Sequence, residues 1–258
     1  VRPKQAEAGQ WMETFFKDSD GYYQDAFAFY FEKGKNTITL VSTKEPMKIG
    51  SLTLARQKEL PDYAGYQAAN QAAGYQDADC ETVTVQGEDA VYKSDSTLYP
   101  IADRTSPLTV PYSPSKTRLN TIGGSNWKQV GQWISWEVEV PRDGLYEIAL
   151  RYRQNINTGV TVVRSLSIDG KIPFAEAREC KFYYGNDWDV TALGTEEEPF
   201  RFFLAAGKHT IQLEVGLGSE MSEIIRRADE CISELNRAYR QLLIVIGSSP
   251  DMFRDYQL

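Results

Sequence analysis

The chain has 258 residues and a mass of 29.2 kDa, with 41% hydrophobic and 25% charged residues, and this globular composition excludes wholesale disorder. Its 36 acidic and 28 basic side chains leave a formal charge of −8, so it lacks the excess of Lys and Arg that binding to nucleic-acid phosphates requires. The single histidine, His209, disfavours a His-rich metal site or a Ser–His–Asp triad, and no run of about 18 apolar residues predicts a direct membrane span.

Residues 27–40 repeat the pattern of residues 200–213. At a constant offset of 173 positions, the two segments share two Phe residues, a Gly-Lys turn and the pattern Thr-Ile-x-Leu. A match of this length predicts two copies of one module. The first copy has only 26 residues before Phe27 and lacks its front half, so residues 1–60 are predicted to be the C-terminal half of a first β-sandwich module. A single irregular sandwich with internal similarity is the alternative.

A half sandwich exposes an apolar face and open sheet edges. We therefore expect residues 1–60 to dock on the second module, to pair with another copy of the chain, or to be completed by further sequence, and the last option favours a piece of a longer protein. Residues 61–80 are rich in Ala, Gln, Tyr and Gly, and they are predicted to be a linker with one or two helical turns.

Residues 81–215 are predicted to form a complete antiparallel β-sandwich. In residues 133–140, apolar side chains alternate with Ser and Glu, which is the pattern of a half-buried strand. Turn residues follow at 141–144, and a second strand follows at 145–152. Short alternating strands without crossover helices favour a sandwich over a parallel α/β fold. Residues 94–126 carry four prolines and predict a long ordered loop, a kind of segment that often carries function.

The hydrophobic period changes after Val215. Apolar residues recur at steps of three and four from Met221 to Ile246, which predicts an amphipathic helix over residues 219–247. Ser219 is the predicted N-cap, and Gly247 is the predicted end. A helix of this length spans about 40 Å, more than a small sandwich needs, so we expect it to lead to a further domain.

Two loops carry aromatic residues among small and polar neighbours. Trp127 follows Gly-Gly-Ser-Asn, and residues 183–188 read Tyr-Tyr-Gly-Asn-Asp-Trp. A sugar ring has an apolar C–H face that a flat aromatic side chain covers, and hydroxyls that Asn or Asp can bind. Each Trp also suits a plug in a sandwich core. The predicted carbohydrate-binding residues are Trp127, Tyr183, Tyr184, Asn186 and Trp188.

Four segments carry a resemblance to a known family. Residues 83–90 read Val-Thr-Val-Gln-Gly-Glu-Asp-Ala, residues 124–127 read Gly-Ser-Asn-Trp, residues 131–141 read Gly-Gln-Trp-Ile-Ser-Trp-Glu-Val-Glu-Val-Pro, and residues 143–146 read Asp-Gly-Leu-Tyr. They resemble carbohydrate-binding modules of families six and thirty-five. The resemblance covers about residues 81–215 and implies a jelly-roll β-sandwich of the galactose-binding-like type, which binds glycan at loops with aromatics and Asn.

The same resemblance implies a structural calcium. Glu88 matches the second acidic ligand of the family's opening strand, whereas Gln86 stands where the family usually has Glu. The closing strand that normally supplies another acidic ligand is replaced in this sequence by the helix.

The wider arrangement resembles a particular class of protein. The half module ending at residues 34–47, the full module, and the segments 234–240 and 250–256 are similar to the front region of large extracellular solute-binding lipoproteins. These belong to carbohydrate ABC transporters of Gram-positive bacteria. The similarity implies an extracellular parent protein anchored at the cell surface, with a downstream solute-binding domain and the transporter as partners.

The predicted function is a non-catalytic module that binds glycan or oligosaccharide, or that positions a transporter's solute receptor near it. Asp187 and Asp189 flank Trp188, but no second acidic pair follows in a matching context, which disfavours glycoside hydrolysis. One alternative is a structural spacer that serves as a docking platform without ligand. Another is an accessory module of a glycoside hydrolase. Buried loop aromatics favour the spacer, and exposed aromatics around a groove favour binding.

Overall fold

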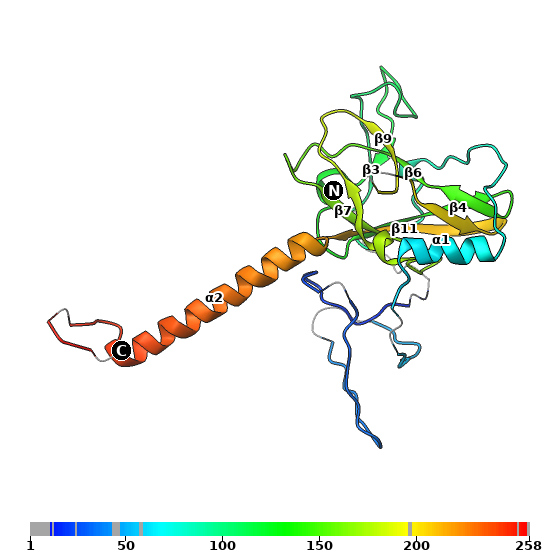
Figure 1. Cartoon of the computed structure of the whole chain (residues 1–258). Helices are drawn as coiled ribbons and strands as arrows, with labels where there is room; N and C mark the ends of the chain where they lie inside the picture. The colour runs from blue at the N-terminus through cyan, green and yellow to red at the C-terminus, as the bar shows by residue number, and fades with distance from the viewer. Residues whose placement is uncertain are drawn as a thin grey trace.

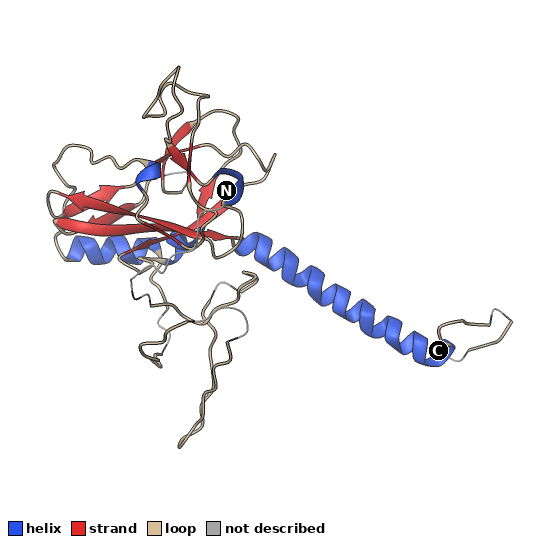
Figure 2. Cartoon of the chain, turned by 180° about the vertical axis from the view of Figure 1, so that it is seen from behind, coloured by secondary structure: helices blue, strands red, loops and turns tan. Residues whose placement is uncertain are grey.

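The computed structural model describes residues 11, 13–23, 25–42, 47–56, 59–195, 198–251 and 253–256. Its strands lie between residues 92 and 216, and a long helix follows them and projects away (Figures 1 and 2). The strands form the mainly β, antiparallel β-sandwich that the sequence predicts.

A five-stranded antiparallel sheet forms one layer of the sandwich. Its strands, in spatial order, are β1 (Tyr92–Lys93), β4 (Trp133–Val140), β11 (Gly207–Gly216), β7 (Val162–Ile168) and β8 (Cys180–Phe182). The other layer is built from three two-stranded pieces. They are β5 (Gly144–Glu147) with β10 (Arg201–Leu204), β6 (Ala149–Tyr152) with β9 (Asp189–Ala192), and β2 (Pro100–Ile101) with β3 (Thr121–Ile122).

The register of the main sheet places apolar side chains side by side. Leu213 on β11 lies opposite Ile134 on β4 and Leu166 on β7, and all three are buried. Burying a side chain of this size contributes about 1.5–3 kcal/mol relative to leaving it exposed. In residues 133–140, Ile134 is buried and Glu137 and Glu139 are exposed, as predicted. Ser135, predicted to share the polar face, is buried instead, because β1 lies beside it and its hydroxyl donates a hydrogen bond of 3.4 Å to the carbonyl oxygen of Tyr92.

An aromatic cluster forms the centre of the core. Phe174 and Phe202 are fully buried, and their rings stack with centroids 5.6 Å apart. Phe174 also contacts Phe200, with ring centroids 4.9 Å apart. Phe174 lies outside the strands, immediately before the short 3-10 helix η3 (Ala175–Glu179), so this connection packs into the core.

Residues 61–80 are more than the predicted linker, because they contain helix α1 (Tyr63–Ala72), which packs on the sandwich. The helix begins after Asp62, whose carboxylate accepts a hydrogen bond of 2.8 Å from the backbone N–H of Gly65. The ring of Tyr63 is buried, 4.9 Å from that of Phe174 and 4.6 Å from that of Phe200. Tyr66 also packs against Phe174, with ring centroids 5.1 Å apart. Two aromatic residues therefore fix a helix whose overall composition resembles that of a linker.

The N-terminal part of the chain forms extended loops below the sandwich, drawn in blue in Figure 1. Among the residues described between 11 and 56, none belongs to a helix or a strand, so the strands expected at 27–40 are absent. Residues 1–10, 12, 24, 43–46, 57 and 58 of the predicted half module lie outside the described residues. The half-module assignment stays a prediction.

Helix α2 (Ser219–Ile246) confirms the predicted amphipathic helix. Gly218, not Ser219, occupies the N-cap position, and the N–H and hydroxyl of Ser219 bind the carboxylate of Glu179 at 2.7 and 3.0 Å. The predicted Ser219 cap is therefore wrong, because a glutamate from η3 takes over its role. Gly247 ends the helix with φ of 73°, as predicted.

Among the described residues, none covers the apolar stripe of α2 over most of its length. Leu235 and Tyr239, in the middle of the stripe, are both exposed. Figure 2 shows the helix leaving the sandwich after its first turns. Within the described ranges, no helix combines the length and the apolar character needed to cross a bilayer.

The core arrangement predicts a large loss of stability for Phe174→Ala. Removing a fully buried aromatic ring should lower the free energy of unfolding by about 3–5 kcal/mol, as measured by urea denaturation. The control is Phe253→Ala, since Phe253 is 95% exposed, and it should change the free energy of unfolding by less than about 0.5 kcal/mol. Similar values for the two variants would contradict this description of the core.

Candidate functional site

A cleft opens between the two layers of the sandwich. Its volume is about 1690 Å³, and its walls include inner-face residues of β4, β7 and β11 on one side and residues of β5 and β6 on the other. Ligand pockets are typically about 300–1,000 Å³, so this cleft is larger than a single small ligand needs. Its size has a structural cause, because residues 77–87 border it and pair with the strands only through a bridge between Asp77 and Leu145.

Three of the five predicted binding residues line this cleft: Trp127, Tyr183 and Trp188. Tyr184 and Asn186 do not line it, and their side chains bind each other through a hydrogen bond of 3.1 Å from Tyr184 Oη to Asn186 Oδ1. Whether any of the five binds a sugar stays a prediction.

Tyr183 and Trp188 lie in the connection between β8 and β9. Because β8 pairs with β7 and β9 pairs with β6, this connection links the two layers at the mouth of the cleft. Tyr183 is exposed, and its backbone N–H donates a hydrogen bond of 3.3 Å to Tyr152 Oη. Tyr183 therefore has an exposed ring on a backbone that the neighbouring strand holds.

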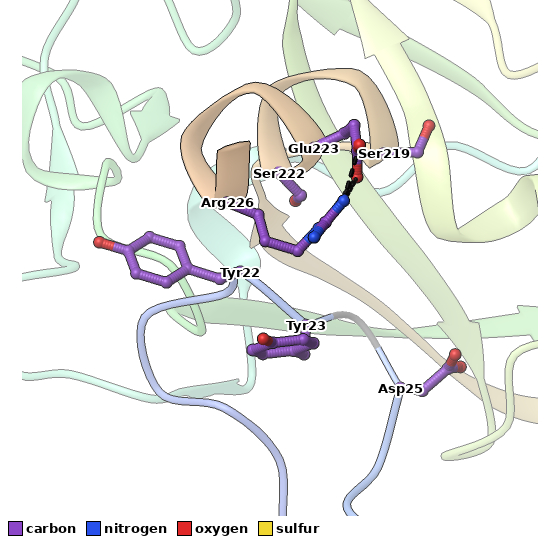
Figure 3. A pocket seen from close by; sticks show the side chains of 7 residues that line it. All are labelled: Tyr22, Tyr23, Asp25, Ser219, Ser222, Glu223 and Arg226. Carbon is purple, nitrogen blue, oxygen red and sulfur yellow. Dashed lines mark hydrogen bonds and ion pairs between the residues drawn. The ribbon is translucent and has the colours of Figure 1, made fainter. Parts of the chain in front are cut away.

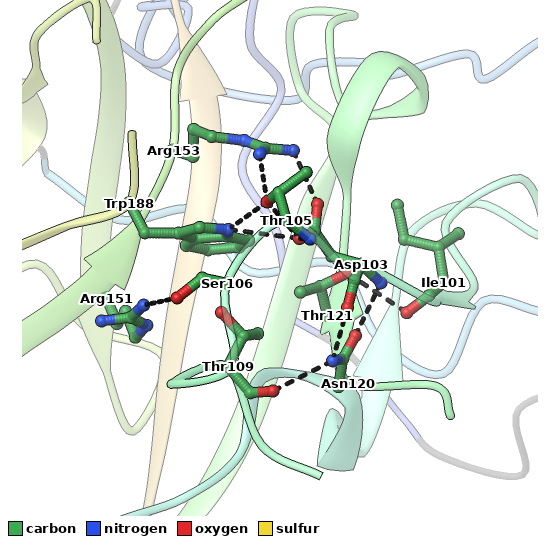
Figure 4. Close-up of polar contacts among 10 residues, drawn as sticks. All are labelled: Ile101, Asp103, Thr105, Ser106, Thr109, Asn120, Thr121, Arg151, Arg153 and Trp188. Carbon is green, nitrogen blue, oxygen red and sulfur yellow. Dashed lines mark hydrogen bonds and ion pairs between the residues drawn. The ribbon is translucent and has the colours of Figure 1, made fainter. Parts of the chain in front are cut away.

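Trp188 is half-buried and held by polar contacts (Figure 4). Its indole N–H lies 3.3 Å from Asp103 Oδ1 and 3.2 Å from Thr105 Oγ1. The guanidinium carbons of Arg151 and Arg153 lie 5.6 and 5.2 Å from the ring centroid, within the range of cation–π attraction. These contacts fix the orientation of the ring and also occupy part of its surroundings.

Asp103 is the centre of this polar network. Its carboxylate forms an ion pair of 2.6 Å with Arg153, and it accepts a hydrogen bond of 2.8 Å from the backbone N–H of Thr105. Burial raises the pKa of Asp103, but the hydrogen bonds from Thr105, the charge of Arg153 and the hydrogen bond from Trp188 outweigh it and hold this pKa below its usual value. The carboxylate is therefore charged at neutral pH.

Asn120 attaches the long Pro-rich loop to the same network. It is buried, and its side-chain amide donates to the carbonyl oxygens of Asp103, Thr109 and Pro111 at 2.9, 3.1 and 3.3 Å. Its Oδ1 accepts a hydrogen bond of 2.8 Å from the backbone N–H of Asp103. One side chain thus orders residues 103–111, as the prediction of an ordered loop over 94–126 requires (Figure 4).

Trp127 is braced on the opposite side of the cleft. The guanidinium carbon of Arg164 lies 4.4 Å from the centroid of its ring, and the indole N–H donates a hydrogen bond of 3.2 Å to the carbonyl oxygen of Gln132. The ring is half-buried and packs against the core. Trp127 therefore combines the two roles weighed from the sequence, since it plugs the sandwich and borders the cleft.

Arg164 is an unusual residue for its position. It lies between Val162 and Leu166 on the inward-facing row of β7, and among the described residues no carboxylate lies within ion-pair distance of it. Burial lowers its pKa to about 10, so it remains charged at neutral pH. Its Nε and the Oγ1 of Thr109 are buried polar atoms that line the cleft without a hydrogen-bond partner among the described residues. Such orphaned atoms are uncommon and can be satisfied by water or a ligand.

The residues around Glu88 do not fit the predicted calcium. Glu88 lies on a 3-10 helix, η1 (Gly87–Asp89), and not on an opening strand, and its Oε2 is buried without a hydrogen-bond partner among the described residues. Ca²⁺ takes six to eight oxygen ligands. Within the part of the chain that the structure describes, no group of three or more His, Cys, Asp or Glu side chains could hold a metal ion.

The sequence pointed to the aromatic loops but missed the polar residues around them. Asp103, Asn120, Arg153 and Arg164 were not among the predicted site residues. Asp103 and Arg153 lie 50 positions apart along the chain, and Arg164 and its partner Trp127 lie 37 positions apart, so no local pattern joins them. The one local signal was the sequence Asp-Arg-Thr-Ser at 103–106, in which Asp103 binds the backbone two residues later, as turn-forming Asp residues do.

Comparisons with known proteins give weak likenesses. No family model matches the sequence, and no curated protein matches it. The chain is similar to a cycloisomaltooligosaccharide glucanotransferase from Paenibacillus sp. complexed with cycloisomaltoheptaose, at 17% identity and a TM-score of 0.38, over 60% of this chain and 20% of that one. It is similar at 17% identity and the same TM-score of 0.38 to a family 35 carbohydrate binding module from Clostridium thermocellum, over 53% of this chain and 87% of that one.

A third similar structure is a β-(1,4)-mannanase from Podospora anserina with a family 35 module, at 19% identity and a TM-score of 0.35, over 53% of this chain and 24% of that one. The chain thus spans about a fifth to a quarter of the length of the two enzymes. Likenesses of this size assign the chain to no family.

The buried carboxylate of Glu88 predicts a pH-dependent cost to stability. Burial raises the pKa of Glu88, so the unfolded state releases this proton at a lower pH than the folded state does. The folded state therefore loses stability relative to Glu88→Gln as the pH rises through the usual Glu pKa and on through the raised one. Urea denaturation should show a free energy of unfolding for Glu88→Gln that is higher, relative to the wild type, at pH 7 than at pH 4.

The control for this prediction is Glu81→Gln, because Glu81 is exposed on the same segment. An advantage of Glu88→Gln that is equal at both pH values would contradict the assignment of the cost to ionisation. The same measurements with added Ca²⁺ test the metal site. Calcium that stabilises the wild type but not Glu88→Gln would show that Glu88 is a ligand after all.

Proposed function

We propose that the sandwich is a non-catalytic carbohydrate-binding module whose glycan lies in the cleft between the two layers. The observation that supports this most directly is the convergence of Trp127, Tyr183 and Trp188 on one cleft whose wall also contains Asp103 and Asn120. An apolar lining with a few ordered polar groups is the usual composition of a small-molecule site.

The exposed ring of Tyr183 is the stacking surface in this proposal. A sugar that covers it with its C–H face removes apolar surface from water, while its hydroxyls reach polar groups of the cleft. The orphaned Arg164 Nε offers a donor, and the orphaned Thr109 Oγ1 offers both a donor and an acceptor. A hydroxyl that binds either atom removes the cost of leaving it unsatisfied.

Trp188 and Trp127 act in this proposal as walls more than as free platforms. Both are half-buried, and guanidinium groups lie near both rings. Their contribution is to hold the shape of the cleft and to offer the ring area that the arginines leave open. Such a site with one exposed stacking ring implies weak affinity, because few contacts must offset the entropy lost on association.

A second candidate is a docking platform without ligand, and a specific observation favours it. The guanidinium groups of arginines lie over the rings of Trp127 and Trp188, where a sugar would otherwise stack. In this case the cleft is a loosely closed part of the sandwich, and the function lies in the attached segments. A third candidate is an accessory module of a glycoside hydrolase.

We also propose the setting of the module from the motif resemblance at residues 34–47, 234–240 and 250–256. In this setting the parent is an extracellular solute-binding lipoprotein at the surface of a Gram-positive cell, with a downstream solute-binding domain and a carbohydrate ABC transporter as partners. The exposed stripe of α2 provides a surface for helices of a following domain.

Glycan binding is tested by titrating the chain with a panel of plant, host and microbial glycans, with and without Ca²⁺, by calorimetry. For any glycan that binds, Tyr183→Ala should weaken the affinity about tenfold, which corresponds to about 1.4 kcal/mol. Trp188→Ala should weaken it at least as much, because it also removes one of the hydrogen-bond partners of Asp103 and Thr105.

The matched control is Tyr239→Ala, because Tyr239 is similarly exposed but lies on α2, away from the cleft. It should leave glycan affinity unchanged. No binding across the panel by a chain that unfolds cooperatively would reject the glycan proposal in favour of the platform. Binding that Tyr183→Ala leaves intact would move the site out of the cleft.

A further inference from the structure

Residues 27–40 and 200–213 share one sequence pattern and one turn geometry. Gly34 and Gly207, at aligned positions, adopt φ of 129° and 130°, a conformation that favours glycine. In the second copy this glycine follows β10 and begins β11. The backbone of the first copy therefore turns as it does between β10 and β11, two consecutive strands that pair in different layers and that we call the closing hairpin.

The two copies differ in what surrounds their apolar side chains. Phe202 is fully buried, whereas Phe29 at the aligned position is 61% exposed. Ile211 is 8% exposed, whereas Ile38 at the aligned position is 42% exposed. The residues that build the core of one copy are thus on the surface in the other.

The reason for this difference is the presence or absence of neighbouring strands. β11 pairs with β4 along one side and with β7 along the other. In the first copy, residues 25–42 belong to no strand of the described structure. Phe27 and Phe29 lie edge to face with ring centroids 6.5 Å apart, and Phe16 contacts Phe29 in the same way, so these rings cover each other only in part.

The base of this N-terminal segment is attached to the sandwich. Asp25 forms an ion pair of 2.7 Å with Arg178, and the carbonyl oxygen of Gly21 accepts a hydrogen bond of 3.2 Å from Ser222 Oγ on α2. Figure 3 shows Tyr22 and Tyr23 beside the first turns of α2, around a small pocket of about 280 Å³. Residues 27–40 therefore extend from an anchored point and away from the sandwich (Figure 1).

We propose that residues 27–40 are the closing hairpin of a second sandwich of the same type, in which residues 35–40 pair between two antiparallel strands as β11 does, and residues 28–31 pair with a third strand as β10 does. The partner is the front half of such a module, with strands that alternate as β4 and β7 do. In the complete copy, β4 and β7 precede the closing hairpin along the chain, so the partner strands are joined ahead of the hairpin in the same polypeptide. The surface consists of Phe27, Phe29, Ile38 and Leu40.

The occupant is argued from the register of the complete copy. There, the residue aligned with Ile38 lies opposite Trp136 and Ile168, and the residue aligned with Leu40 lies opposite Ile134 and Leu166. A partner with apolar residues at these spacings covers the exposed face and pairs both edges of residues 35–42. A partner of charged or helical character does neither, because the free edges need extended backbone beside them.

The test adds such a front half to the whole chain. Residues 81–199 are duplicated and joined through a flexible Gly/Ser linker ahead of Val1, and amide hydrogen exchange is followed in residues 35–42. Exchange should slow at least about 100-fold relative to the unmodified chain, because these amides gain partners on both sides. The same fusion carrying Phe29→Asp and Ile38→Asp should keep the fast exchange.

A second variant needs no added segment. Residues 27–40 replace residues 200–213 in the full chain, which keeps its length because both segments have 14 residues. If they are a closing hairpin, the grafted chain unfolds cooperatively and its grafted amides are protected. A graft of residues 106–119 at the same place is the control and should not fold.

Three results would overturn the proposal. One is exchange in residues 35–42 that stays as fast in the folded fusion as in the unmodified chain. Another is a graft of residues 27–40 that does not fold, the result expected of its control. The third is an unmodified chain that already dimerises with residues 35–42 protected, because the partner would then be a second copy.

Discussion

The two-sided pairing of β11 is the constraint on which the rest of the structure depends. β11 pairs with β4 over residues 207–214 and with β7 over residues 211–216, so it joins strands from distant parts of the chain. Its inward-facing Ile211 and Leu213 belong to the core around Phe174. The turn before β11 leads back to β10, which pairs with β5 in the other layer. The connection from β10 to β11 therefore holds both layers together.

The candidate site depends on the strands that β11 holds together, but it lies outside the centre of the core around Phe174. β7 carries Arg164 beside Val215 of β11, and β8 continues into the connection with Tyr183 and Trp188. The polar network around Asp103 then links that connection to the Pro-rich loop. Regular strands thus fix the ends of the segments, and side-chain hydrogen bonds fix their middles, which is how ordered loops usually carry binding groups.

The sequence predicted the elements whose signal is local. The alternation in residues 133–140 and the stripe in residues 219–247 report faces of a strand and a helix, and both elements formed. Helix α1 was expected only as a turn or two of a linker. Its position depends on contacts between distant residues, such as those of Tyr63 with Phe174 and Phe200. Such a contact between distant residues leaves no periodic pattern.

The residues of the candidate site also divide into those with a local sequence signal and those placed by contacts between distant residues. Aromatic residues in polar loops pointed to Trp127, Tyr183 and Trp188, whereas the ion pair of Asp103 with Arg153 and the inward position of Arg164 follow from the topology alone. The strands expected at 27–40 show that a local pattern alone does not make a strand. Their pattern matches that of residues 200–213, but a strand is defined by its neighbours, and the described structure provides none there.

The open cleft has the same physical origin. Residues 77–87 form no strand, and their backbone pairs with the strands only at the bridge of Asp77 with Leu145. The layer therefore stays incomplete at this point, and the cleft reaches Trp136 and Val138 on the inner face of β4. A ligand bound there touches residues that also form the core, so the same residues would contribute to binding and to stability. Tyr183 is the aromatic residue at the cleft that is exposed enough to contact a ligand without first giving up core contacts.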